Sequence, residues 1–209
     1  MRTRNKIWGV LLTLALLALT PLTAVPAYAA VTLEADLISA LQSDTASTIT
    51  LDGDITLSTI TVSMGANHTI EAGGFTLTIS GGENYSDGGR IDLDIYTLTL
   101  KGNAVIESVQ GIRSANGTLN LENVTATLKI ANSIHAGTVN VNSGAIVNLN
   151  SNRSDGLGGS LLTLQNSTYS LNVNSGGVIN IQDAFGVGIN NSSSGKININ
   201  SGGAINIGV

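Results

Sequence analysis

The chain has 209 residues, of which 3% are aromatic and 11% charged, and it contains no cysteine. A chain without cysteine has no disulfide, zinc–thiolate site or thiol nucleophile. Three of its nine basic residues lie before residue 30, so the remainder carries six basic and fourteen acidic residues, a charge of −8. This balance argues against a nucleic-acid partner, because such binding depends on Lys and Arg neutralising phosphates.

Residues 1–29 have the pattern of a secretory signal peptide. Basic Arg2, Arg4 and Lys6 precede the apolar run Ile7–Leu19, and Ala27-Tyr28-Ala29 fits the small-x-small cleavage rule. The apolar run is too short to span a bilayer comfortably. We therefore expect a protein that is secreted or held at the cell surface, bacterial in origin, with no transmembrane segment in the mature chain.

Residues 30–46 predict an N-terminal cap helix region. The stretch "LEADLISALQS" begins at Leu33, and Thr32 is a suitable N-cap residue. Helical spacing gathers its large apolar residues on one face, namely Leu33, Leu37, Ile38 and Leu41. The first coil of a solenoid exposes unpaired backbone groups and apolar side chains, and a short amphipathic helix would cover both.

Residues 47–209 predict strands throughout. "STITLDGDITLSTITV" begins at Ser47, "HTIEAGGFTLTIS" at His68 and "RIDLDIYTLTL" at Arg90, and all three alternate apolar and polar residues. A period of two gives a strand with one dry and one wet face. Thr takes the outward positions, and β-branched Thr favours strands.

Three copies of nearly one sequence follow. "VNVNSGAIVNL" covers residues 139–149, "LNVNSGGVINI" residues 171–181 and "ININSGGAINI" residues 197–207. Each reads as strand, bend, strand, because Asn and Gly tolerate the positive φ of a tight bend. A hairpin is one possibility. Stacked coils explain the likeness better, since Asn over Asn forms amide ladders and Ile over Ile fills a core.

The spacing of the strands also favours coils. Strands starting at Leu119, Val139, Leu171 and Ile197 begin 20, 32 and 26 residues apart, in the range of solenoid repeats. A third strand is predicted in each coil, at Gly111–Arg113, Lys129–Ala131, Leu161–Thr163 and Val187–Ile189. About six or seven coils fit the mature chain at this period. The predicted fold is all-β, a parallel β-helix with three strands per coil.

The same pattern predicts which side chains point inward. The inward set is Val141, Leu149, Val173, Ile181, Ile199 and Ile207, and the outward set is Asn140, Asn172 and Asn198. The final strand, Ala204–Ile207, is followed by only two residues. We expect a β-helix that is incomplete at its C-terminus, with a last coil that is either frayed or self-associates.

The order of signal peptide, "LEADLISALQS", "TITLDGDITL" and "NHTIEAGGFTLTIS" resembles the start of pectin-lyase-like right-handed parallel β-helix proteins of bacterial surfaces. The "VNSGA" and "VNSGG" copies resemble the repeats of bacterial adhesins, including autotransporter-type passengers. The resemblance implies a right-handed β-helix. That superfamily holds polysaccharide lyases, hydrolases and non-catalytic adhesins, so the resemblance leaves the function open.

The best candidate for a catalytic site is the group Arg90, Asp92 and Asp94. If all three share one strand face, the two carboxylates lie about 7 Å apart, within the range of about 5–10 Å that glycoside hydrolases use. Arg113 is expected on the next coil. A solvated strand face is the simpler interpretation, because residues 108–121 contain no Asp or Glu. His68 and His135 lack acidic neighbours and are expected to be strand or loop residues.

The function expected from these observations is a non-catalytic structural or adhesive segment. Its partner would be a carbohydrate or another cell-surface polymer, and no metal or cofactor is implied. A polysaccharide-active lyase or hydrolase is the first alternative. An ice-binding solenoid is the second, suggested by Thr-x-Thr pairs such as Thr97/Thr99, although Asn and Lys replace Thr in later coils. "SDGLGGSLL" at Ser154 lacks the GGxGxD order of a Ca²⁺-binding repeat.

Overall fold

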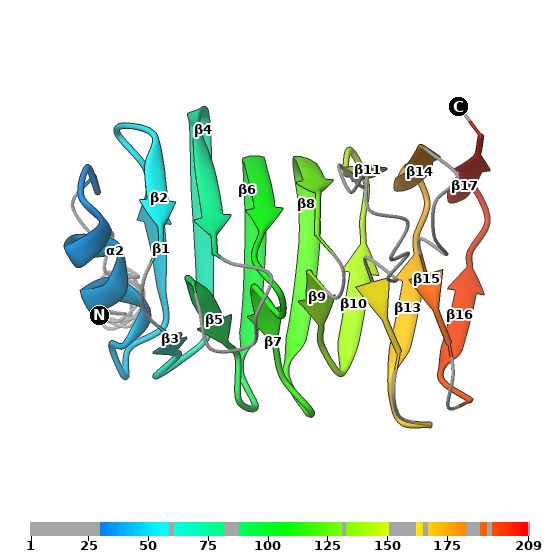
Figure 1. Ribbon diagram of the computed structural model, residues 1–209, viewed down its shortest axis with the longest axis horizontal. Helices are drawn as coiled ribbons and strands as arrows, with labels where there is room; N and C mark the ends of the chain where they lie inside the picture. Colours follow the sequence, from blue (N-terminus) through cyan, green and yellow to red (C-terminus); the bar gives the residue numbers. More distant parts are fainter. Residues whose placement is uncertain are drawn as a thin grey trace, which may run out of the picture.

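Stacked parallel strands account for most of the residues that the structure describes. The computed structural model describes residues 30–58, 61–81, 88–130, 133–150, 162–164, 167–182, 189–191 and 194–208. The predicted signal peptide and residues 154–161 of the stretch at Ser154 lie outside these residues. The strands lie side by side in chain order along the longest axis, with helix α2 (Glu34–Leu41) at the N-terminal end (Figure 1).

The strands form two sheets. The long sheet contains β1 (Ser47–Thr50), β2 (Ile55–Leu57), β4 (His68–Ser80), β6 (Thr97–Glu107), β8 (Thr118–Leu128), β10 (Thr138–Val141), β11 (Ile146–Asn150), β13 (Ser170–Val173), β14 (Val178–Gln182), β16 (Lys196–Ile199) and β17 (Ala204–Ile207). The short-strand sheet contains β3 (Thr61–Ser63), β5 (Arg90–Asp92), β7 (Ile112–Arg113), β9 (Ile134–His135), β12 (Leu162–Thr163) and β15 (Ile189–Asn190).

All strand pairings among the described residues are parallel. For example, Val139 of β10 lies between Leu119 of β8 and Leu171 of β13. Consecutive strands in a hairpin would be antiparallel, so the near-identical copies are stacked coils and not hairpins. This arrangement confirms the prediction of an all-β chain with parallel, solenoid-like stacking.

Asn side chains form ladders up the stack, as the repeats predict. The Nδ2 of Asn140 donates to Asn120 Oδ1 at 2.8 Å, Asn172 to Asn140 at 2.8 Å and Asn198 to Asn172 at 2.7 Å. A parallel ladder joins Asn142, Asn174 and Asn200. Each hydrogen bond contributes a net stabilisation of about 1 kcal/mol, and the ladder fixes the register between coils.

The predicted inward residues of the earlier coils are buried. Val141, Leu149 and Val173 have no exposed surface, and Ile181 is partly buried against the core. Ile199 and Ile207 occupy equivalent register positions but are 55% and 78% exposed. They are exposed because, within the described residues, no further strand pairs with β16 or β17 on their outer side.

A column of left-handed residues bends the long sheet between its two halves. These residues are Gly73, Gly102, Asn123, Gly144, Gly176 and Gly202, with φ values from 46° to 94°. Gly and Asn are the residues that adopt this conformation at least cost. Backbone hydrogen bonds join neighbours in the column; for example, Gly176 N–H donates to Gly202 O at 2.9 Å. The "SGG" and "SGA" bends of the sequence therefore sit at one corner of successive coils.

The predicted helix forms, but two details of it were wrong. Leu37 and Leu41 are fully buried in the core next to the first strands. Thr32 is not the N-cap, because the helix begins one residue later with extended Leu33 at that position and no side-chain cap. Leu33 therefore precedes the helix and is 61% exposed instead of lying on the buried face. Within the described residues, no helix combines the length and hydropathy that crossing a bilayer requires.

One predicted strand was misplaced. The third strand expected at Lys129–Ala131 lies instead at Ile134–His135. A turn precedes it, in which the backbone N–H of Ser133 donates to Ile130 O at 3.2 Å. Ser133 is fully buried, and its hydroxyl also bonds to Ile130 O. Because of this turn the strand begins only at Ile134, which pairs with Ile112 of the preceding coil.

Candidate functional site

A row of polar side chains crosses the outer face of the short-strand sheet. Strand pairing aligns Ser63 with Asp92, Asp92 with Arg113, and Arg113 with His135. The residues one position earlier, such as Ile91, Ile112 and Ile134, are fully buried. Alternation along strands of two or three residues therefore places an apolar column inside and this polar row outside.

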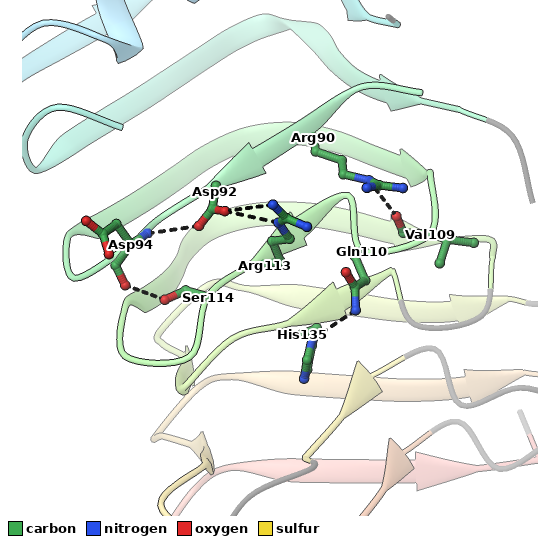
Figure 2. A network of polar contacts seen from close by, with 8 residues as sticks. All are labelled: Arg90, Asp92, Asp94, Val109, Gln110, Arg113, Ser114 and His135. Atoms are coloured by element: carbon green, nitrogen blue, oxygen red, sulfur yellow. Dashed lines mark hydrogen bonds and ion pairs between the residues drawn. The ribbon is translucent and has the colours of Figure 1, made fainter. Parts of the chain in front are cut away.

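Asp92 and Arg113 form an ion pair within the row. Arg113 Nε and Nη2 each lie 3.0 Å from Asp92 Oδ2, and the backbone N–H of Asp94 donates to Asp92 Oδ1 at 3.2 Å (Figure 2). Both carboxylate oxygens are thus already engaged. A carboxylate held in this way is a poor candidate for a general base, because both of its oxygens already accept hydrogen bonds from the protein and a base must accept a proton from its substrate.

The other two predicted site residues make contacts of their own outside this ion pair. Asp94 was expected on the same strand face, but β5 ends at Asp92 and Asp94 lies in the following turn with φ 52°. Its carbonyl oxygen accepts a hydrogen bond from Ser114 Oγ. Arg90 is only 6% exposed, and its Nε donates to Val109 O at 3.2 Å. The structure therefore brings Asp92 together with Arg113 on successive coils, as predicted, while Asp94 lies in a turn and Arg90 is hydrogen-bonded to Val109.

His135 lies beyond Arg113 in the row and is held by two neighbours. Gln110 Nε2 is 3.2 Å from His135 Nδ1, and the ring of Tyr169 lies 5.6 Å from the imidazole at an angle of 54°. Burial lowers the pKa of His135, and the charge of Arg113 lowers this pKa further. Burial also raises the pKa of the Tyr169 hydroxyl. Both rings are therefore uncharged at neutral pH.

The neutral imidazole has one polar atom without a described partner. If Gln110 donates to Nδ1, the proton of the ring sits on Nε2. This Nε2 is buried and makes no hydrogen bond to the described part of the chain. A buried donor of this kind favours a water molecule or a ligand oxygen at that point.

A hollow of about 240 Å³ lies over the row. Its polar lining consists of Asp92, Gln110, Arg113, Ser114, His135 and Tyr169. Because Asp92 and Arg113 cancel each other's charge, the lining offers mainly neutral hydrogen-bonding groups. No three His, Asp or Glu side chains in the described ranges are close enough to hold a metal ion.

The chain matches no protein-family model, no curated protein and no solved structure. Its parallel stacked strands support the β-helix part of the predicted resemblance.

Sequence reasoning missed Gln110, His135 and Tyr169 as site residues. His135 was expected to be a strand or loop residue without acidic neighbours, and it does lie in β9. The usable signal was the short repeated pattern of Ile followed by a polar residue, at Ile91, Ile112 and Ile134. Aligning these three positions places His135 in line with Asp92 and Arg113. Gln110 reaches the row from a turn and Tyr169 from the position just before β13, and no periodicity reveals either contact.

Proposed function

We propose that this protein is an exported segment of a right-handed parallel β-helix, of about six or seven coils, with a non-catalytic structural or adhesive role at the cell surface. The in-register stack is the main support. Coils joined by backbone bonds and Asn ladders give a stiff rod whose outer faces repeat from coil to coil. Repeated, extended surfaces of this kind suit binding to polymers. The signal-like residues 1–29 support export.

The pairing of Asp92 with Arg113 supports a role without catalysis. A lyase needs a free base, and a glycosidase needs two carboxyl groups that flank the scissile bond. Here one candidate carboxylate is engaged by an arginine and the other belongs to a residue within a turn. The neighbouring Gln110, Ser114 and His135 are groups that can bind a polar ligand by hydrogen bonds.

We expect no breakdown of polysaccharide by the purified protein. The test incubates it with pectin, polygalacturonate and neutral glycans, and follows the absorbance of unsaturated products and the release of reducing ends. Asp92→Asn is compared with the unchanged protein, and circular dichroism checks that both are folded. Degradation that Asp92→Asn abolishes in a folded protein would show an enzyme and overturn this proposal.

A further inference from the structure

A second polar face lies away from the site described above. It is on the half of the long sheet that comes before the left-handed column in each coil. We call it the Thr/Asn face. Its first row is Thr97, Thr118, Thr138 and Ser170, and its second row is Thr48, Thr69, Thr99, Asn120, Asn140 and Asn172. All ten side chains are partly exposed. The rows are in register even though the coils differ in length, because the additional residues lie outside these strands.

The geometry of the Thr/Asn face is regular in two directions. Neighbouring strands in a sheet lie about 4.8 Å apart, and side chains two positions apart on one strand are separated by about 7 Å. Each Asn amide uses one N–H and one oxygen lone pair in its ladder. The second N–H and the second lone pair of each amide remain for another partner. The face therefore repeats hydrogen-bonding groups at each coil.

The Thr/Asn face carries no charged side chain. The charges beside it are Lys196, which continues the first row beyond Ser170, and the adjoining row, where Lys101 lies 3.3 Å from Glu71 and 4.0 Å from Glu122. These two positive and two negative charges leave the surroundings of the face without net charge. A surface without net positive charge has no electrostatic preference for an acidic polymer such as polyuronate. Its complement is an uncharged partner that is rich in hydroxyl groups.

The first strands of the face also contain a hollow of about 370 Å³. Thr48, Asn67, Thr69, Thr97 and Thr99 contribute to its lining. A flat row that leads into a hollow can accept a chain of sugar rings. The rings would lie on the sheet, and a substituent of one ring would enter the hollow. The shape of the face and its hydrogen-bonding groups therefore favour the same uncharged, hydroxyl-rich class of partner as its lack of charge does.

We propose that the Thr/Asn face binds an uncharged polysaccharide chain that runs along the rows from coil to coil. This inference rests on the proposed adhesive function and names its ligand class. Ice is the other regular partner of such a surface. Thr and Asn differ in length, so the polar atoms of the second row change height between Thr99 and Asn120. A polymer chain adapts to such a step, whereas a crystal lattice does not.

The test measures the affinity of the purified protein for insoluble cellulose and xylan, with polygalacturonate as the acidic comparison. The test variant carries Thr97→Val, Thr118→Val and Thr138→Val, which remove three hydroxyls and keep the β-branched shape. The matched control carries Thr56→Val, Thr78→Val and Thr127→Val, on the outer face of the second half of the same sheet. Circular dichroism and thermal melting verify both folds.

We expect binding to a neutral polysaccharide, at least tenfold weaker in the test variant and unchanged in the control, because three hydrogen bonds are lost. Equal loss in both variants, binding to polygalacturonate alone, or no binding to cellulose or xylan would overturn the inference. Thermal hysteresis that only the test variant loses would assign the face to ice instead. Adhesion to intact cells that the test variant retains would refute this inference and leave the proposed function standing.

Discussion

Val173→Asp is expected to unfold the protein or to lower its free energy of unfolding by several kcal/mol. Val173 has no exposed surface and lies between Val141 and Ile199 of the neighbouring coils. A carboxylate at this position would be buried among apolar side chains without a partner, which costs several kcal/mol even after its pKa rises. Urea denaturation followed by circular dichroism measures the change.

The matched control is Asn172→Asp, one residue earlier on the same strand. Asn172 is on the outer face, where it donates to Asn140 and accepts from Asn198. The aspartate keeps the acceptor and loses the donor, so the expected cost is about 1–2 kcal/mol. Equal losses of stability in the two variants would show that the inward and outward faces are assigned wrongly.

Gly177→Ala is expected to destabilise the protein by about 1–3 kcal/mol. A Cβ atom at Gly177 would lie 2.3 Å from the carbonyl oxygen of Val141 in the preceding coil. Real contacts of this kind are never so short, and the obstacle is backbone, so the two coils must separate locally. That separation lengthens the ladder bonds on either side of the corner.

Gly74→Ala controls for the loss of a glycine as such. A Cβ atom at Gly74 meets nothing within 4 Å, and its φ is not in the left-handed region. Its stability should change by less than about 1 kcal/mol in either direction. A Gly177→Ala variant as stable as Gly74→Ala would contradict the close approach of the coils at this corner. Thermal melting of both variants decides between the outcomes.

Strands and their orientation could be predicted from the sequence because the long strands carry enough alternating residues to define a period. Near-identical copies then gave the register, which places Asn140 on Asn120 and Asn172 on Asn140. The short-strand sheet was harder to predict. Its strands have only two or three residues, so the alternation of apolar and polar residues is too short to fix where a strand begins. For this reason β9 was expected four or five residues too early.

The candidate site could be predicted only where it depends on strand pairing. Arg113 lies beside Asp92 because both occupy outward positions on successive coils. Asp94 does not share that face, because it adopts a left-handed turn conformation that spacing alone does not reveal. Gln110 also has a positive φ of 53°, and this conformation brings its side chain to His135. Contacts made by turns depend on backbone geometry, and the period of the sequence carries no information about it.

Disulfide formation between introduced cysteines tests the parallel, in-register stacking most directly, since the chain has no cysteine of its own. Thr138 and Ser170 are register partners on β10 and β13. Neighbouring strands place such partners about 5 Å apart, within the range of about 4.4–6.8 Å between Cα atoms that a disulfide allows. In the shifted pair, Thr138 and Asn172, the Cα atoms are about 8 Å apart, which is too far.

We expect Thr138→Cys with Ser170→Cys to form an intramolecular disulfide under mild oxidation, and Thr138→Cys with Asn172→Cys to remain reduced, as measured by thiol titration and mass spectrometry. An equal or higher yield of disulfide in the shifted pair, or no disulfide in the register pair, would contradict the stacked parallel coils.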